Sequence, residues 1–208
     1  MLNRFKIPLV ALALLLAATA SVVLLKQIEP TPLEFDSSMG IPVMSPPIPL
    51  PEVNLVDQHN QPFQTSTLKG SWNLLFFGFT NCPDVCPTTL NNLKQAAKQL
   101  SQQPIRYIFV SLDPNRDSPE KLKDYMNFFN PEFTALTGNK AEIDRLSEAL
   151  GVIYDYEGDT SSDDYSVNHY AAILVVDPQA RLRAHILPPH SASKIVTGIS
   201  LIMDYYGN

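Results

Sequence analysis

Beyond residue 52, short apolar runs alternate with segments in which apolar residues recur every three or four positions. An apolar run bounded by turn residues is typical of a buried strand, and the three-to-four repeat is typical of an amphipathic helix. The expected strands are residues 53–56, 62–64, 72–80, 105–112, 133–136, 171–177 and 181–187, and helical patterns follow Cys86, Ser118, Asn139 and Ser191.

Local signals mark where the expected helices begin and end. Ser118 is a good N-cap, and Pro119 follows it at the first helical position. Asn139 with Glu142 imitates a capping box, and Gly151 is a favourable C-terminal stop. These signals support separate helices between the strands.

Strands that alternate with crossover helices predict an α/β domain with a central, mostly parallel sheet and helices on both faces. The strands at 53–56 and 62–64 are expected to form a hairpin, and so are those at 171–177 and 181–187. A cysteine motif follows the first long strand. This order of elements is that of a thioredoxin-like fold.

The N-terminus has the pattern of a membrane anchor. Arg4 and Lys6 precede an uncharged run over residues 7–25, and Lys26 ends it. A helix of this length spans roughly 28 Å, about the hydrocarbon thickness of a bilayer. The positive flank predicts that residues 1–29 form a single transmembrane helix in the cytoplasmic membrane, with the remainder on the periplasmic side. A cleaved signal peptide is the rival interpretation.

Residues 30–51 contain seven prolines, so we expect an extended tether there. Residues 52–208 then form one domain of ordinary size. The net charge of −6 argues against a nucleic-acid partner.

Cys82 and Cys86 are the only cysteines, and they lie where the first long strand gives way to a helix. Residues four apart on a helix share a face, and the helix N-terminus favours thiolate. Such a pair can form a disulfide, exchange thiols with a partner, or bind a soft metal ion. Structural zinc sites take four protein ligands, whereas Cu(I) accepts fewer. The spacing alone leaves these alternatives open.

His169 is the candidate third ligand, because it lies just before the strand expected at 171–177. In a thioredoxin-like sheet, the loop that enters this strand packs against the cysteine loop. Thioredoxin-type oxidoreductases usually have a cis-proline there, and this chain has no proline between Pro131 and Pro178. His59, His185 and His190 are expected to be structural or solvated. The acidic residues of 155–165 indicate a surface loop, or a mobile flap that docks a partner.

Four blocks of the sequence resemble the SCO/SenC family: residues 77–87, 110–119 and 136–138, and His169 ahead of 176–178. Proteins of this family are membrane-anchored, thioredoxin-fold copper carriers for cytochrome c oxidase assembly. The resemblance implies a copper ion bound by Cys82, Cys86 and His169. It also implies that the family's aspartate-rich turn corresponds to Asp113 and Asp117.

Three positions depart from the family pattern. Asn81 stands where a histidine or aromatic residue often precedes the first cysteine. Asn168 replaces the usual aspartate before the ligand histidine, and Tyr170 replaces a small residue after it. An aspartate could orient the imidazole, and asparagine is expected to keep the hydrogen bond without the charge.

The resemblance therefore implies a copper chaperone rather than an enzyme. Its expected partners are the copper-site subunit of cytochrome c oxidase and other periplasmic copper carriers or thiol reductants. The alternative is a membrane-anchored thiol–disulfide oxidoreductase that reduces the cysteines of the oxidase copper site. A peroxidase of the peroxiredoxin kind is disfavoured, because no arginine has an evident reason to point at the sulfurs. Met39 and Met44 are expected to be exposed in the tether.

Overall fold

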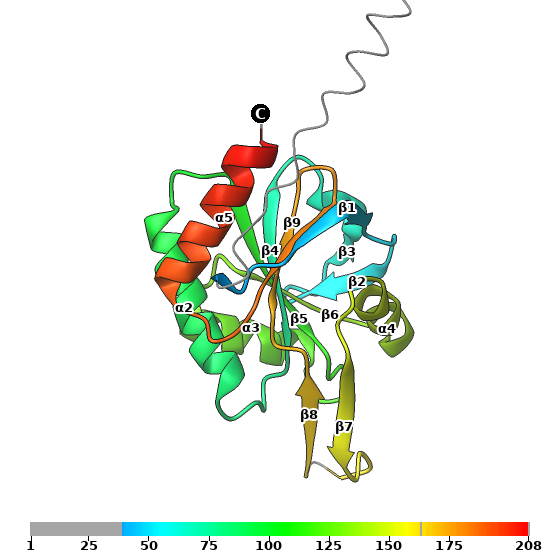
Figure 1. The fold of residues 1–208 in the computed structure, drawn as a ribbon. Helices are drawn as coiled ribbons and strands as arrows, with labels where there is room; N and C mark the ends of the chain where they lie inside the picture. The colour runs from blue at the N-terminus through cyan, green and yellow to red at the C-terminus, as the bar shows by residue number, and fades with distance from the viewer. Residues whose placement is uncertain (1–38, 163, 208) are drawn as a thin grey trace, which may run out of the picture. The chain divides into compact units, whose positions relative to one another are not determined.

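The computed structural model of the protein describes residues 39–162 and 164–207. An eight-stranded sheet has the strand order β1-β10-β9-β4-β5-β6-β2-β3, and a separate two-stranded sheet joins β7 and β8 (Figure 1). The strands are β1 (Val43–Pro49), β2 (Asn54–Asp57), β3 (Pro62–Gln64), β4 (Trp72–Gly78), β5 (Ile105–Ser111), β6 (Thr134–Thr137), β7 (Tyr154–Gly158), β8 (Tyr165–His169), β9 (Ile173–Val176) and β10 (Arg181–Ile186). The helices are η2 (Thr65–Leu68), α2 (Val85–Gln99), α3 (Pro119–Phe129), α4 (Lys140–Ala149) and α5 (Ala192–Tyr206).

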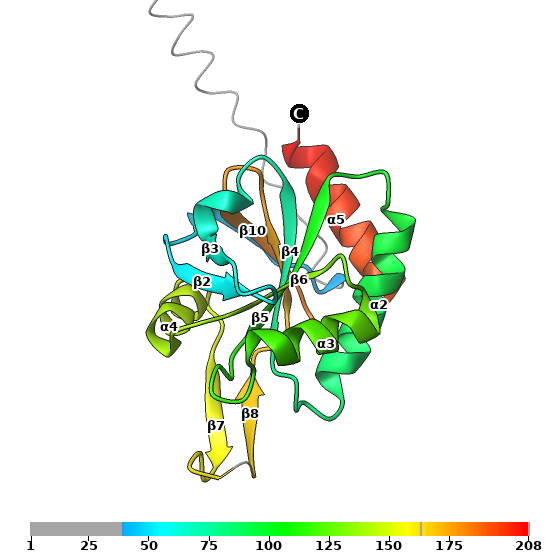
Figure 2. The same ribbon diagram turned by 180° about the vertical axis from the view of Figure 1, so that it is seen from behind.

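Helices cover both faces of the large sheet, as expected. All seven residues of β4 are buried, which places this strand in the core. On one face, Tyr125 of α3 packs against Phe109 of β5, and Gly198 of α5 approaches Ile186 of β10. Figures 1 and 2 show α2, α3 and α5 grouped on one side and α4 apart from them, near β2. The predicted N-caps Ser118, Asn139 and Ser191 all accept backbone hydrogen bonds.

The expectation of a mostly parallel sheet is wrong. Within the described residues, seven strand pairs build the large sheet, and only β4–β5 and β5–β6 are parallel. The chain reaches β9 through the β7–β8 hairpin, and Ile173 at the start of β9 pairs with Phe76 near the end of β4. The chain therefore enters β9 beside the C-terminal end of β4, which makes the two strands antiparallel. A parallel β9 would require the chain to cross back to the N-terminal end of β4 first.

Part of the proline-rich segment is a strand, not a free tether. β1 pairs antiparallel with β10 at the edge of the large sheet, and the preceding Ile41 is only 3% exposed. Prolines are tolerated at a sheet edge because the backbone there needs hydrogen-bond donors on one side only. Met39 and Met44 are correspondingly half-buried against the core, contrary to the expected exposure.

The expected anchor and the start of the tether, residues 1–38, lie outside the described residues. In the part of the chain that is described, no helix combines the length and apolarity needed to cross a membrane.

The acidic segment expected to be a loop forms a β-hairpin instead. Tyr154–Gly158 pairs antiparallel with Tyr165–His169, and the hairpin projects beyond the large sheet in both views (Figures 1 and 2). Tyr165 and Val167 are buried, whereas Ser166 and Asn168, which alternate with them, are exposed. This alternation is the period of a strand with one covered face. The acidic residues obscured it in the sequence.

Candidate metal centre

The two cysteines lie where β4 ends and α2 begins. Cys82 is half-buried in the loop, and Cys86 is buried in the first turn of α2. The backbone N–H of Cys86 donates to Cys82 Sγ over 3.4 Å. Both thiols are free, so the pair is in its reduced form.

His169 faces this pair from the end of β8. Its Nε2 lies 3.8 Å from Cys86 Sγ. The imidazole packs edge-on against Phe76 and Phe79, with ring centroids 6.2 and 6.3 Å away. His169 therefore lies beside Cys86, as the sequence predicts, although it is the last residue of β8 rather than part of the loop that enters β9.

Asn168 does not orient the imidazole. Its side-chain amide donates to Glu157 across the hairpin, and His169 Nδ1 is buried without a hydrogen-bond partner. The expectation that Asn168 keeps a hydrogen bond to the imidazole of His169 is therefore wrong. Neighbouring residues in a strand point to opposite faces, so Asn168 and His169 diverge.

The donor set fits a soft metal ion. Among the residues described, no group of three or more His, Cys, Asp or Glu side chains is arranged so that it could hold a metal ion. The 3.8 Å between Cys86 Sγ and His169 Nε2 nevertheless suits an intervening ion. Cys82, Cys86 and His169 would hold such an ion, and two thiolates with one imidazole suit Cu(I).

The two thiols differ in their acidity. The pKa of Cys82 is lowered far below its usual value, mainly because its thiolate accepts a hydrogen bond from the Cys86 thiol. His169 and the backbone N–H of Cys86 act in the same direction, and burial opposes them. The pKa of Cys86 is raised, first by the bond to Cys82 and then by burial. The reduced pair therefore holds one negative charge on the accessible sulfur and one proton on the buried sulfur.

Gly78, the last residue of β4, leaves room for the buried sulfur. A Cβ atom at this position would lie 2.8 Å from Cys86 Sγ and 2.9 Å from a ring carbon of Phe109. Real Cβ atoms do not approach other atoms so closely. We did not expect this role from the sequence, although a glycine in an apolar strand often marks a close approach of other atoms.

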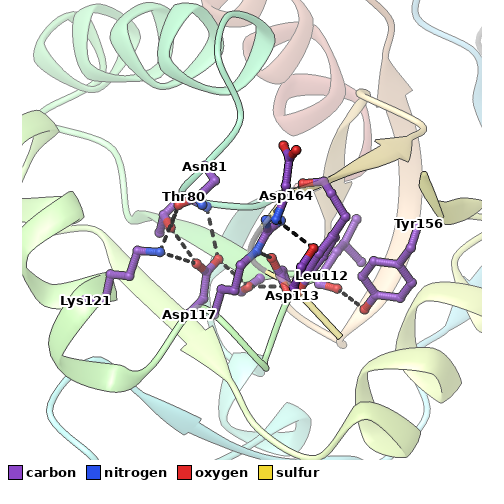
Figure 3. A network of polar contacts seen from close by, with 12 residues as sticks. Thr80, Asn81, Leu112, Asp113, Asp117, Lys121, Tyr156 and Asp164 are labelled. Carbon is purple, nitrogen blue, oxygen red and sulfur yellow. Dashed lines mark hydrogen bonds and ion pairs between the residues drawn. The ribbon is translucent and has the colours of Figure 1, made fainter. Parts of the chain in front are cut away.

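Asp117 connects the cysteine loop to the turn between β5 and α3 (Figure 3). Its carboxylate is fully buried and accepts from Thr80 N (3.0 Å), Thr80 Oγ1 (2.5 Å) and Ser111 Oγ (2.7 Å). Lys121 Nζ lies 3.7 Å from the same carboxylate and donates to Asn81 Oδ1 over 2.9 Å. Asn81 therefore contacts α3 through its side-chain oxygen.

The other three histidines have the structural or solvated roles expected of them. His59 lies exposed in the β2–β3 turn. Nδ1 of His190 is 3.0 Å from Thr89 Oγ1, and its Nε2 is 3.0 Å from the carbonyl oxygen of Ile186. His185 Nδ1 lies 3.2 Å from the hydroxyl of Tyr170.

Known proteins with similar sequences and folds have names that refer to copper or to SCO proteins. The SCO1/SenC family model matches residues 50–204. A Stutzerimonas stutzeri protein, provisionally named a copper-binding protein, is 40% identical over 158 residues, covering 74% of this chain and 77% of that protein. An SCO2-like protein of Rickettsia prowazekii is 36% identical over 145 residues, covering 68% and 71%. The crystal structure of yeast Sco1 with copper bound superposes with a TM-score of 0.72 at 27% identity, covering 77% of this chain and 91% of that one.

The fold and the site define a thioredoxin-like domain that carries a reduced cysteine pair and a facing histidine. The chain belongs to the SCO1/SenC family.

Proposed function

We propose that this protein is a copper chaperone that binds copper through Cys82, Cys86 and His169. It would deliver the ion to the copper site of cytochrome c oxidase during assembly. The observation that carries the proposal is the approach of His169 Nε2 to within 3.8 Å of Cys86 Sγ from a strand 83 residues away in sequence. Copper-bound relatives support the choice of ion.

Transfer would proceed by ligand exchange. The half-buried Cys82 thiolate is the sulfur that an incoming copper ion meets first. Binding of the second sulfur displaces the proton that Cys86 holds, because only a thiolate is a strong ligand. His169 would then supply the third ligand from β8. Delivery would reverse these steps, as ligands of the recipient protein replace His169, Cys86 and Cys82 one by one.

Replacement of His169 tests the three-ligand arrangement. We expect His169→Ala to weaken Cu(I) binding beyond the roughly 10- to 100-fold cost of losing an outer contact. The measurement is competition with a chromophoric Cu(I) chelator, using reduced full-length protein. His59→Ala, an exposed histidine far along the chain, is the matched control. Equal affinity of His169→Ala and the parent protein for one copper would rule out the arrangement.

A thiol–disulfide reductase is the second candidate, and the unequal acidity of the thiols favours it. An accessible thiolate at Cys82 can attack a partner disulfide, and the neighbouring Cys86 can resolve the mixed disulfide. The segment entering β9 contains no proline, unlike that of thioredoxin-type oxidoreductases. Turnover on a protein disulfide substrate distinguishes the two activities, since a carrier alone should show a negligible rate. A substantial rate that survives in His169→Ala would favour the reductase.

The proposed location rests on the pattern of charged and apolar residues at the N-terminus. We place residues 1–29 in the cytoplasmic membrane and the copper-binding domain on its periplasmic side. The copper-site subunit of cytochrome c oxidase is the recipient, and periplasmic copper carriers or thiol reductants would load and reduce the pair. Fractionation of cells, followed by protease treatment of spheroplasts, tests this orientation: the domain should be degraded without lysis.

A further inference from the structure

A fully buried carboxylate, Asp113, joins the β5–α3 turn to the β7–β8 hairpin. Arg116 Nε donates to Asp113 Oδ2 over 2.5 Å, and the hydroxyl of Tyr165 donates to Asp113 Oδ1 over 2.6 Å. Each carboxylate oxygen therefore takes one strong donor. We name Asp113, Arg116 and Tyr165 the hairpin clasp.

Arg116 also contacts Tyr165 directly, in two ways. One guanidinium nitrogen donates to the carbonyl oxygen of Tyr165 over 2.9 Å, and the guanidinium carbon lies 3.4 Å from the centre of its ring. The hydroxyl of Tyr156, on the neighbouring strand, donates to the carbonyl oxygen of Leu112 over 2.7 Å (Figure 3). Both strands of the hairpin are thus fixed to the same turn.

The clasp and the metal centre are at opposite ends of one short strand. Tyr165 is the first residue of β8 and His169 is the last. Residues four apart in a strand point to the same face, so the side chain fixed by the clasp and the imidazole share one side of the hairpin. Asp117, in the same turn as the clasp, binds Thr80 beside the cysteine loop. The β5–α3 turn therefore contacts both the cysteine loop and the hairpin that carries His169.

The chemistry of the clasp suits orientation better than stability. A buried ion pair adds little net stability, because desolvation offsets the attraction. A guanidinium is planar and can bind a carboxylate, accept a stacked ring and donate to a carbonyl at once, which a lysine cannot do. Burial raises the pKa of Tyr165 to about 12, so its hydroxyl remains a donor at neutral pH.

We propose that Asp113, Arg116 and Tyr165 are positioning residues for the metal centre, which hold β8 so that His169 faces the cysteine pair. This inference rests on the proposed copper function. The clasp touches neither the sulfurs nor the imidazole, and it acts through the strand.

A double-mutant cycle on full-length protein tests the inference. Tyr165→Phe keeps the ring and removes only the hydroxyl. We expect it to weaken Cu(I) binding by about tenfold, the lower end of the cost of losing an outer contact. In a His169→Ala background the same change should have no further effect, because the residue through which it acts is gone. Tyr107→Phe, which removes the hydroxyl of a half-buried tyrosine in β5, is the matched control and should leave the affinity unchanged.

Two further measurements separate positioning from folding. In Cu(II)-loaded protein, Tyr165→Phe and Arg116→Lys should both reduce the nitrogen hyperfine coupling in the electron paramagnetic resonance spectrum. Their sulfur-to-copper charge-transfer band should persist. If Tyr165→Phe and Arg116→Lys both leave the copper affinity and the nitrogen coupling unchanged while His169→Ala still loses copper, the positioning role of the clasp is refuted. The proposed copper function would not be affected by that result. Equal losses in the parent and His169→Ala backgrounds would also overturn it, since they would report general destabilisation. A parent protein that binds no copper would instead refute the proposed function.

Discussion

At the residue scale, the main feature of the site is the inequality of its two thiols. Cys82 is held as an accessible thiolate and Cys86 as a buried thiol, because each stabilises the other's protonation state through one hydrogen bond. In the sequence the two cysteines are chemically identical, and nothing indicates which of them is the more acidic. The loop and the first turn of α2 make them different.

We expect removal of the Cys86 thiol to raise the pKa of Cys82. In metal-free, reduced protein, Cys86→Ala eliminates the largest cause of the lowered pKa. A raised pKa reduces the thiolate fraction at acidic pH, so the midpoint of the alkylation rate against pH should move to higher pH. Mass spectrometry of iodoacetamide-treated protein measures it. Cys86→Ser retains a hydroxyl donor and should shift the midpoint less. An alkylation profile unaltered in Cys86→Ala would contradict the hydrogen-bond explanation.

At the element scale, two parts of the fold have weak signals in the sequence, and one of them carries a residue of the centre. β1 is rich in proline and β7–β8 is rich in acidic residues, yet β1 completes the edge of the large sheet and β8 carries His169. β1 is a strand because it pairs with β10, which is remote in sequence, whereas β7 and β8 pair with each other across a short turn.

The contribution of the segment around β1 can be measured with a matched pair of isoleucines. Ile41 is 3% exposed and packs toward Gly198 of α5, whereas Ile48 within β1 is 36% exposed. We expect Ile41→Ala to lower the free energy of unfolding by about 2–5 kcal/mol, and Ile48→Ala to change it by about 0.5 kcal/mol or less. Urea denaturation measures both. Similar small losses at the two positions would mean that this segment is not part of the cooperative fold.

Local patterns predicted most helices and strands, because caps, apolar periodicity and turn residues are all encoded within a few positions. The N-caps at Ser118 and Asn139 are examples. Long-range relations were harder to predict. The direction of β9 depends on the β7–β8 hairpin, whose acidic residues made it resemble a loop in the sequence. The roles of Arg116 and Tyr165 depend on contacts between residues that are 49 positions apart. The cysteine pair was evident from spacing, whereas His169 required a fold, or the family resemblance, to place it.

At the scale of the whole molecule, the candidate centre joins three separate parts of one core. The end of β4, the start of α2 and the end of β8 meet there, and the β5–α3 turn contacts both the cysteine loop and the hairpin. Metal bound at such a junction links parts of the chain that otherwise separate on unfolding. Binding and global stability are therefore coupled.

Copper should raise the thermal stability of the reduced protein. A ligand that binds only the folded state stabilises it by about 2.7 kcal/mol at a hundredfold excess over its dissociation constant. We expect a clear rise in Tm on adding Cu(I), a smaller rise in His169→Ala, and reversal of the rise when a chelator removes the metal. Differential scanning calorimetry records all three.

Oxidation provides the contrasting outcome. A disulfide between Cys82 and Cys86 removes both sulfur ligands, so oxidised protein should bind no Cu(I) and show no copper-dependent change in Tm. Quantification of copper and free thiols with and without reductant measures this. Full copper loading of the oxidised protein would show that the sulfurs are not the ligands.

The missing side chain at position 78 restricts how this centre can be transferred to another scaffold. A designer who grafts the two thiols and the imidazole onto a related sheet would fail wherever the receiving strand ends in alanine or anything larger, because the inner sulfur would collide with the new methyl group. The glycine must therefore be transferred together with the three ligands. Gly78→Ala in this protein would introduce the same collision by adding a single methyl group.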